Sequence, residues 1–379
     1  MYWIALKMLT GDRGKYWAII VGITFSCVLI AEQSAIFCGI MLRTTSQIRD
    51  IHDADIWVMN SNLRYIDDLK AIADTAYLRV RGVPGVAWAV SLYKGAGQAQ
   101  LANGNYQGVI LIGVDDATLV GAPQEFIVGK VGDLQLPNAV VVDEAGFRYM
   151  WPDEPLKVGK TFQMNDTRAV IVGIYKASQT FQTQPILYTR FNRAIAFVPQ
   201  YRRVLSFVLA KCAPGEDPEV IARRIGQQTG LQALTRDQFS WLTMTYYLVR
   251  TGIPINFGTT VLLGFVVGCA VVGQTFYLFT VENLRQFGTL KAMGMSDRKI
   301  IAMILVQAIV VGTVGYCIGV GLATLLGIWM QWVRPLMSFF LPWQVLALTG
   351  LAVLVIVLLS SLLSIRRVLV LEPAMVFQG

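Results

Sequence analysis

Residues 16–41, YWAIIVGITFSCVLIAEQSAIFCGIM, form an apolar stretch in which Glu32 is the single charged residue. Three further stretches, residues 256–280, 300–330 and 343–365, contain no charged residue. About 20 helical residues cross the roughly 30 Å hydrocarbon core of a bilayer, so each stretch is long enough to span a membrane. The sequence therefore predicts an α-helical integral membrane protein with four transmembrane helices, the first of them retained rather than cleaved.

The composition agrees with membrane embedding. Of the 379 residues, 55% are hydrophobic and 15% are charged, whereas soluble domains average about 25% charged residues. The net charge of +8 is spread along the chain, which argues against a nucleic-acid-binding surface. Four of the five cysteines lie in predicted spans and leave Cys212 alone outside them, which argues against a disulfide-stapled domain.

The basic residues predict the orientation of the chain. Residues 1–15 contain three Lys or Arg residues, residues 281–299 contain four and the tail contains two, against Arg334 alone in residues 331–342. Positive charges in short loops mark the cytoplasmic side of a membrane. We therefore expect a multi-pass membrane protein with both termini in the cytoplasm.

Residues 42–255 separate the first two predicted spans and are long enough to form a domain outside the cytoplasm. Short β-rich runs bounded by Gly, Pro or polar residues predict strands at residues 86–93, 109–114, 169–175 and 206–210. Helices are predicted at residues 65–80 and 218–229. We expect a large α+β domain with two lobes, between residues 1–41 (an interfacial helix and the first span) and residues 256–379 (the other spans and the tail).

Enzymatic and metal chemistry are disfavoured. His52 is the only histidine, so a multi-histidine metal site is excluded and we expect no metal. The segment Gly159-Lys160-Thr161 matches the end of a phosphate-binding loop, but Glu154 stands where that motif requires glycine. We interpret it as a turn before a strand, and we expect no ATPase activity in this chain.

The segment between the second and third spans, VENLRQFGTLKAMGMSDRKI (residues 281–300), carries apolar residues at every third position from Leu284 to Met293. This pattern favours a short amphipathic helix ended by Gly294, with Ser296 beginning the next helix. A solvated connector is the alternative that the pattern leaves open.

The chain resembles the MacB/FtsX/LolC-type ABC transporter permeases in three features. These are the layout of the spans, the segment ENLRQFGTLKAMGMS (residues 282–296) and the ending Glu372-Pro373-Ala374. The sequence of residues 282–296 is most similar to that of the DevC-like and haem-exporter-like branch of these permeases. Many relatives carry an acidic residue at the position of Gln286, so a salt bridge there is not expected in this chain.

The resemblance implies a permease subunit of the bacterial inner (cytoplasmic) membrane that works with a second copy of itself and with a separate ABC ATPase subunit. ATP and Mg²⁺ would bind to that partner, and this chain would hold no cofactor. ATP hydrolysis would move the extracytoplasmic domains and export a lipophilic substrate from the outer leaflet or the periplasm. A periplasmic adaptor and an outer-membrane exit duct are partners of some relatives, membrane lipid surrounds the chain, and haem enters only as a possible substrate.

The resemblance also assigns roles to residues. A coupling surface for the ATPase would be formed by Glu282, Leu284, Arg285, Phe287, Leu290, Lys291 and Met293. A substrate cavity between two copies would be lined by Glu32, Gln33 and Met41. An ionised carboxylate within a membrane costs about 2.5–3.5 kcal/mol on insertion scales, so Glu32 is expected to face a cavity or a partner.

Other interpretations remain open. Glu32 could instead form a structural hydrogen bond, or act as a haem ligand together with Met41 or His52. The same arrangement of four spans and one extracytoplasmic domain would also suit an FtsX-like regulator of cell-wall hydrolases, which transports nothing. A membrane sensor is a third class, but its cytoplasmic segments would be too short to signal without a partner.

Overall fold

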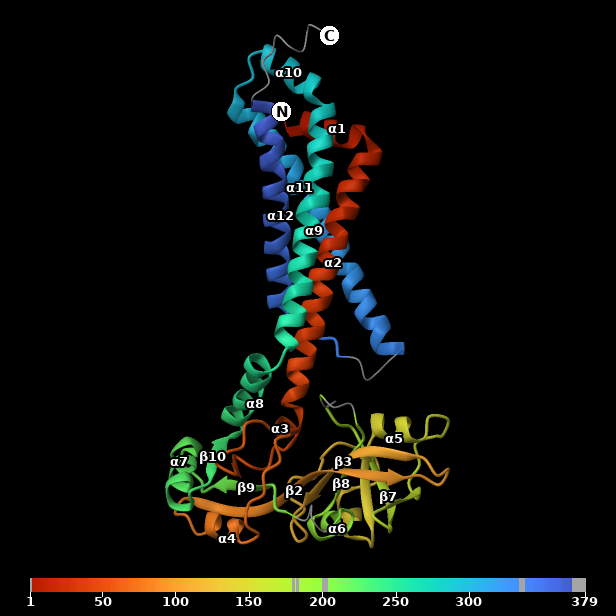
Figure 1. The fold of residues 1–379 in the computed structure, drawn as a ribbon, viewed down its shortest axis with the longest axis vertical. Coiled ribbons are helices and arrows are strands. Elements are labelled where there is room, and N and C mark those ends of the chain that lie inside the picture. The colour runs from red at the N-terminus through yellow and green to blue at the C-terminus, as the bar shows by residue number, and fades with distance from the viewer. Residues whose placement is uncertain (1, 179–180, 182–183, 200–203, 334–337, 370–379) are drawn as a thin grey trace. The chain divides into compact units, whose positions relative to one another are not determined.

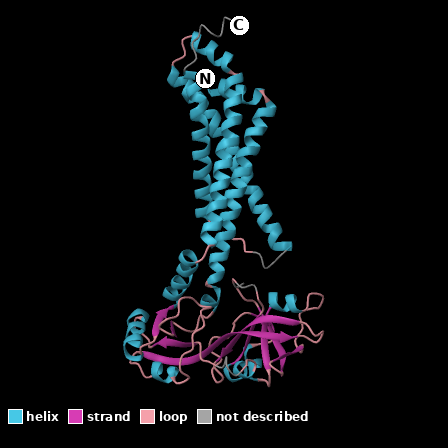
Figure 2. Ribbon diagram, in the orientation of Figure 1, coloured by secondary structure: helices cyan, strands magenta, loops and turns pink. Residues whose placement is uncertain are grey.

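The computed structural model describes residues 2–178, 181, 184–199, 204–333 and 338–369, so Arg334 and the ending Glu372-Pro373-Ala374 lie outside the described residues. The chain divides into two compact units, one of Met1–Ile40 with Gly252–Gly379 and one of Met41–Thr251. We call them the membrane unit and the globular unit. Figure 2 shows that the membrane unit is helical and that the strands lie in the globular unit.

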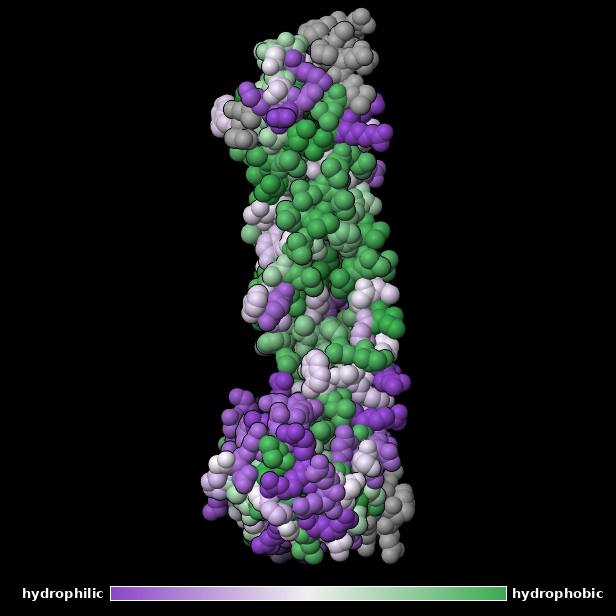
Figure 3. All heavy atoms as spheres, turned by 90° about the vertical axis from the view of Figure 1, so that its left-hand side faces the viewer, coloured by the Kyte–Doolittle hydropathy of each residue, from purple (hydrophilic) through white to green (hydrophobic). Residues whose placement is uncertain are grey.

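The membrane unit contains six described helices, labelled in Figure 1: α1 (Tyr2–Gly11), α2 (Arg13–Thr44), α9 (Ile253–Glu282), α10 (Leu284–Ala292), α11 (Asp297–Val333) and α12 (Trp343–Leu369). Helices α2, α9, α11 and α12 are long and apolar enough to cross a membrane. Their outward surface is apolar, as lipid requires, and Figure 3 shows this surface in green along the helices. The predicted class of a four-helix membrane protein with an α+β domain is confirmed.

Small residues let α2 pack closely against two other helices. A Cβ atom added to Gly268 of α9 would lie 2.6 Å from Ser26 Oγ, and one added to Gly319 of α11 would lie 2.6 Å from Cys27 Cβ. The preceding glycine on α11, Gly315, is equally close to Ile23. In lipid, apolar side chains gain little from meeting each other, so close backbone approach of this kind holds helices together.

The first lobe of the globular unit is a four-stranded antiparallel sheet in the order β10-β1-β9-β2, with helices on it. Its elements are α3 (Ser46–Asp50), β1 (Ile56–Met59), α4 (Ala76–Arg81), β2 (Val86–Gln100), β9 (Phe207–Cys212), α7 (Pro218–Thr229), β10 (Gln232–Thr235) and α8 (Arg236–Arg250). The βαββαβ succession in this strand order is the ferredoxin-like arrangement.

The second lobe is inserted between β2 and β9 and continues the same sheet in the order β2-β3-β8-β5-β7-β4, with β6 pairing β2 and β7. Its elements are β3 (Tyr106–Val114), β4 (Phe126–Val128), the 3₁₀ helix η1 (Val131–Gln135), β5 (Ala139–Asp143), α5 (Glu144–Met150), β6 (Thr161–Met164), β7 (Thr167–Tyr175), β8 (Ile186–Arg190) and α6 (Phe191–Ala196). The long strand β2 joins the lobes, because its first half pairs with β9 and its second half with β3.

Most predicted elements of this unit are confirmed. The four predicted strands correspond to β2, β3, β7 and β9, and the helix predicted at residues 218–229 is α7. The Asp217 side chain caps α7 by accepting from Glu219 N at 2.9 Å. The turn at Gly159 is also confirmed, because φ is +94° there and strand β6 begins at Thr161.

The helix predicted at residues 65–80 is wrong in its first part, since only Ala76–Arg81 is helical. The Asp68 carboxylate accepts from Arg64 N at 3.1 Å, a local bond that competes with helix formation. Asp67 is held by the buried Lys94 at 2.5 Å, and Ile72 forms an isolated bridge with Leu205. These tertiary partners keep residues 65–75 in turns and extended backbone.

Candidate functional site

The short helix α10 connects α9 to α11 and is seated on the membrane unit by one aromatic side chain. Phe287 is 1% exposed and belongs to a buried apolar cluster with side chains of α1, α2, α9, α11 and α12. Leu284 and Met295 pack against this cluster from either end of the segment. The helix ends at Ala292, and the chain turns away at Gly294, whose φ of +89° favours glycine, as the sequence predicts.

Ion pairs, and one hydrogen bond from a side chain to a backbone carbonyl, connect the ends of α10 to the neighbouring helices. Glu282, the last residue of α9, pairs with Lys15 of α2, and Lys15 also pairs with Asp12 at 2.7 Å. Lys291 lies 3.2 Å from Asp297 at the start of α11, and its Nζ donates to Leu369 O of α12 at 3.2 Å. Each of these partly exposed pairs contributes only about 0–1 kcal/mol. Together with the Phe287 cluster they join α10 to the same ends of α2, α9, α11 and α12.

Among the described residues, no side chain of the apolar cluster covers the opposite side of the segment. We call Arg285, Gln286, Thr289, Ala292 and Met293 its outer face, because all five are exposed and helical spacing places them on one side. The Met293 side chain is 71% exposed.

The structure changes the roles expected within this segment. Phe287 points into the core of its own chain, so its expected place on an outward coupling surface is wrong, and Leu284 is half-buried for the same reason. The apolar period of three residues comes from a helix that is buried on one side. Arg285 and Met293 lie on the outer face, while Glu282 and Lys291 form ion pairs within the chain and Leu290 lies between the two sides.

Glu32 lies on a side of α2 that neither α9 nor α11 covers. Helical spacing places it in line with Val21 and Phe25, which are 62% and 54% exposed. The Glu32 side chain is half-buried and, within the described ranges of the chain, its carboxylate has no hydrogen-bond or ion-pair partner. The structure therefore leaves a carboxylate on an apolar, outward-facing stripe of a membrane helix.

The other two residues of the expected cavity lie elsewhere. Gln33 falls between Leu29, which approaches Gly264, and Phe37, whose ring centroid is 5.7 Å from that of Phe257, so it is on the side of α2 that faces α9. Met41 is 5% exposed and buried, which corrects its expected place on an open cavity wall. No cluster of three or more His, Cys, Asp or Glu side chains suited to a metal ion occurs among the described residues.

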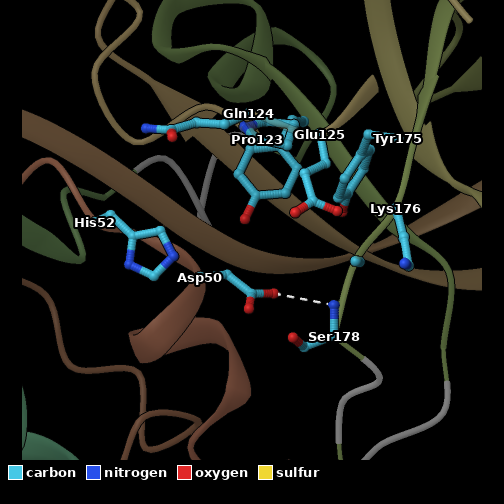
Figure 4. A pocket seen from close by; sticks show the side chains of 10 residues that line it. Asp50, His52, Pro123, Gln124, Glu125, Tyr175, Lys176 and Ser178 are labelled. Carbon is cyan, nitrogen blue, oxygen red and sulfur yellow. Dashed lines mark hydrogen bonds between the residues drawn. The ribbon is translucent and has the colours of Figure 1, made fainter. Parts of the chain in front are cut away.

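A pocket in the globular unit could not be predicted from the sequence, because its residues come from four separate segments. Its volume is about 270 Å³, and it is lined by Asp50, His52, Pro123, Gln124, Glu125, Tyr175, Lys176, Ala177, Ser178 and Tyr188. Figure 4 shows Asp50 and His52 on one side and Gln124, Glu125 and Tyr175 on the other. Burial raises the pKa of Asp50, although the carboxylate accepts from Ser178 N at 3.2 Å.

Comparison with known families assigns both halves of the chain. The MacB-like periplasmic core domain matches residues 17–228, and the FtsX-like permease C-terminal domain matches residues 235–373, which include α10. The chain belongs to the MacB/FtsX-type family of ABC transporter permeases. The resemblance of its sequence to these permeases is thereby confirmed.

Individual relatives of this permease match over a smaller part. An uncharacterised ABC transporter permease of Mycobacterium tuberculosis is 37% identical over 116 residues, which are 30% of this chain and 31% of the relative. A protein of Staphylococcus haemolyticus named as a hemin transport system permease, HrtB, is 28% identical over 109 residues, 29% of this chain and 30% of that relative. These matches span less than a third of each relative's length.

Two solved structures are similar to parts of the permease. The periplasmic region of MacB from Actinobacillus actinomycetemcomitans is 16% identical, with a TM-score of 0.37, over 54% of this chain and 96% of that structure. The extracellular domain of the transporter YknZ from Gram-positive bacteria is 13% identical, with a TM-score of 0.35, over 48% of this chain and 98% of that structure.

Proposed function

We propose that this permease couples ATP hydrolysis by a separate ABC ATPase subunit to the export of a lipophilic substrate. In this proposal the ATPase binds the outer face of α10, and ATP and Mg²⁺ are held by that subunit. The permease chain itself catalyses no reaction. Movement of α10 is passed through the membrane helices to the globular unit, which acts on the substrate in the outer leaflet or the periplasm.

The observation that carries the proposal is the two-sided character of α10. Its inner side is fixed by Phe287 and by the pairs of Glu282 and Lys291 to four membrane-spanning helices. Its outer face leaves Met293 and Arg285 uncovered, and interfaces are enriched in methionine and arginine. A partner bound there could displace all four helices together, because a packed core transmits movement as a unit.

Glu32 supports the presence of a second copy. A carboxylate that faced hydrocarbon would cost about 2.5–3.5 kcal/mol on insertion scales, so its stripe with Val21 and Phe25 is better placed against a partner chain or a polar cavity. We propose that two copies pair through this side of α2 and that Glu32 lines the space between them. Haem is one possible substrate there, since HrtB is named for hemin transport.

The distribution of basic residues supports the orientation. With Lys7 in α1, Arg13 and Lys15 at the start of α2, and four Lys or Arg residues in residues 281–299, both termini and α10 would lie in the cytoplasm. The globular unit would then lie outside the inner membrane, where a periplasmic adaptor and an outer-membrane exit duct are possible partners. Regulation of cell-wall hydrolases, as in FtsX-like proteins, uses the same orientation.

Charge introduced on the outer face of α10 tests the proposal. Met293→Glu should abolish co-purification with the ABC ATPase that accompanies the wild-type chain, because an unpaired charge at the centre of an interface costs several kcal/mol. Met293→Leu is the matched control and should retain the complex. Normal complex yield with Met293→Glu would remove the outer face from the interface. Loss of wall-hydrolase activation without any loss of substrate export would favour the regulatory function instead.

A further inference from the structure

The pocket in the globular unit combines a buried floor with an open acidic rim. Tyr175 and Tyr188 are 2% and 3% exposed and form the floor, with their ring centroids 5.3 Å apart and their planes perpendicular. Asp50 is half-buried, and Glu125 is exposed at the rim. The volume of about 270 Å³ is close to the lower end of small-molecule sites, which start at about 300 Å³.

The two carboxylates are not neutralised by the protein. Among the residues that the structure describes, no Lys or Arg side chain forms an ion pair with Asp50 or Glu125. Lys176 also borders the pocket and is exposed, so the lining carries one ammonium side chain beside the two carboxylates. Two carboxylates and one ammonium group leave the described lining with an excess of negative charge.

The floor contributes a polar atom without a partner. The hydroxyl of Tyr175 is buried and has no hydrogen-bond partner among the described residues, although buried hydroxyl groups are nearly always bonded. Leaving such a group unpaired costs the free energy of its lost hydration. Like the carboxylates, this oxygen can accept a hydrogen bond, and the adjacent aromatic rings attract cations by their faces.

His52 adds a donor at the opposite side. The Arg236 guanidinium lies 3.3 Å from His52 Nδ1, and a guanidinium can only donate, so Nδ1 is the acceptor and the ring proton is on Nε2. The described lining thus carries the two carboxylates and the Tyr175 hydroxyl as acceptors, and the His52 N–H, the Gln124 amide and the Lys176 ammonium group as donors. This pattern does not suit an anion.

We propose that this pocket binds a small organic ammonium ion, such as an aromatic or aliphatic amine with about ten non-hydrogen atoms. The ammonium group lies between Asp50 and Glu125 and donates to Tyr175, and an acceptor on the ligand meets His52. A metal ion is the less suitable occupant, because no group of three ligating side chains is assembled among the described residues. The inference is independent of the proposed transport function, since binding requires neither ATP nor an ATPase.

Equilibrium dialysis of the purified full-length chain in detergent with labelled tyramine tests the proposal. Tyrosol, which replaces the ammonium group by a hydroxyl, is the matched neutral probe. We expect saturable binding of one tyramine per chain and at least tenfold weaker binding of tyrosol. Equal binding of both probes, or no saturable binding of tyramine, would overturn the assignment.

Variants of the lining residues test whether tyramine binds in this pocket. Asp50→Asn and Glu125→Gln should each weaken tyramine binding at least tenfold, and Tyr175→Phe should weaken it several-fold. Asp153→Asn, at an exposed carboxylate outside the pocket, should leave binding unchanged. Unaltered binding by Asp50→Asn would contradict the proposal, as would complete displacement of tyramine by 1 mM CaCl₂, which would indicate a metal site. Thermal unfolding of each variant distinguishes lost binding from lost folding.

Discussion

The contact between α2 and α11 leads to a prediction in which one chemical change has opposite effects at two positions. Gly319 and Gly321 lie two residues apart on α11, but a Cβ atom at Gly319 would lie 2.6 Å from Cys27 Cβ and 3.1 Å from Thr24 O, whereas nothing lies within 4 Å of one at Gly321. Substitution of either glycine by alanine gains the same helix propensity, up to about 1 kcal/mol. Only Gly319→Ala forces two helices apart.

The size of the effect follows from this geometry. Carbon atoms in contact are about 3.5–4.0 Å apart, so the 2.6 Å approach at Gly319 requires a separation of roughly 1 Å. Overpacking of this kind costs about 1–3 kcal/mol. Gly321→Ala should therefore be neutral or stabilising, and Gly319→Ala should be less stable than Gly321→Ala by about 1–3 kcal/mol, or roughly 2–12 °C in unfolding temperature for a unit of this size.

The buried thiol of Cys27 provides the assay, because it lies at the contact that is disturbed. Heating the full-length chain in detergent with a thiol-reactive fluorophore reports the temperature at which this thiol becomes accessible, in a background where Cys38, Cys212, Cys269 and Cys317 are replaced by serine or alanine. Equal midpoints for the two alanine variants would refute the proposed close packing of α2 on α11.

Three further predictions concern stability. Phe287→Ala should destabilise the membrane unit by about 3–5 kcal/mol in the same assay, while Met293→Ala should change it by less than about 0.5 kcal/mol. Lys94→Met should lower the unfolding temperature of the globular unit, because it leaves the Asp67 carboxylate without its buried partner at a cost of about 3–5 kcal/mol, and the double variant with Asp67→Leu should recover most of the loss. Asp50 has a folded-state pKa above its ordinary value of 3.8, so it costs stability once the pH exceeds both values, and Asp50→Asn should raise the unfolding temperature at pH 7 but not below pH 3.8.

The sequence predicts those features that depend on local pattern. The spans follow from charge-free stretches, α7 from the Asp217-Pro218 start and the Gly230 end, and the end of α10 from Gly294.

Features that depend on distant partners could not be predicted in this way. The first part of the helix expected at residues 65–80 does not form, because Asp67 pairs with Lys94, which is far along the chain. The apolar period around Phe287 indicates an amphipathic helix but not whether its apolar side faces the same chain or a partner. The pocket combines Asp50, Glu125 and Tyr175, whose separation in sequence leaves no local signal.

The most direct measurement of the central claim is site-specific photo-crosslinking from α10 in the assembled complex. A photoreactive phenylalanine analogue at position 293, on the outer face, should crosslink to the ABC ATPase. The same analogue at position 287 replaces a side chain that is 1% exposed and should crosslink within the permease. We expect the crosslink at position 293 to be lost when the ATPase is absent. A crosslink to the ATPase from elsewhere in the chain, with none from position 293, would contradict the assignment of α10 as the coupling site.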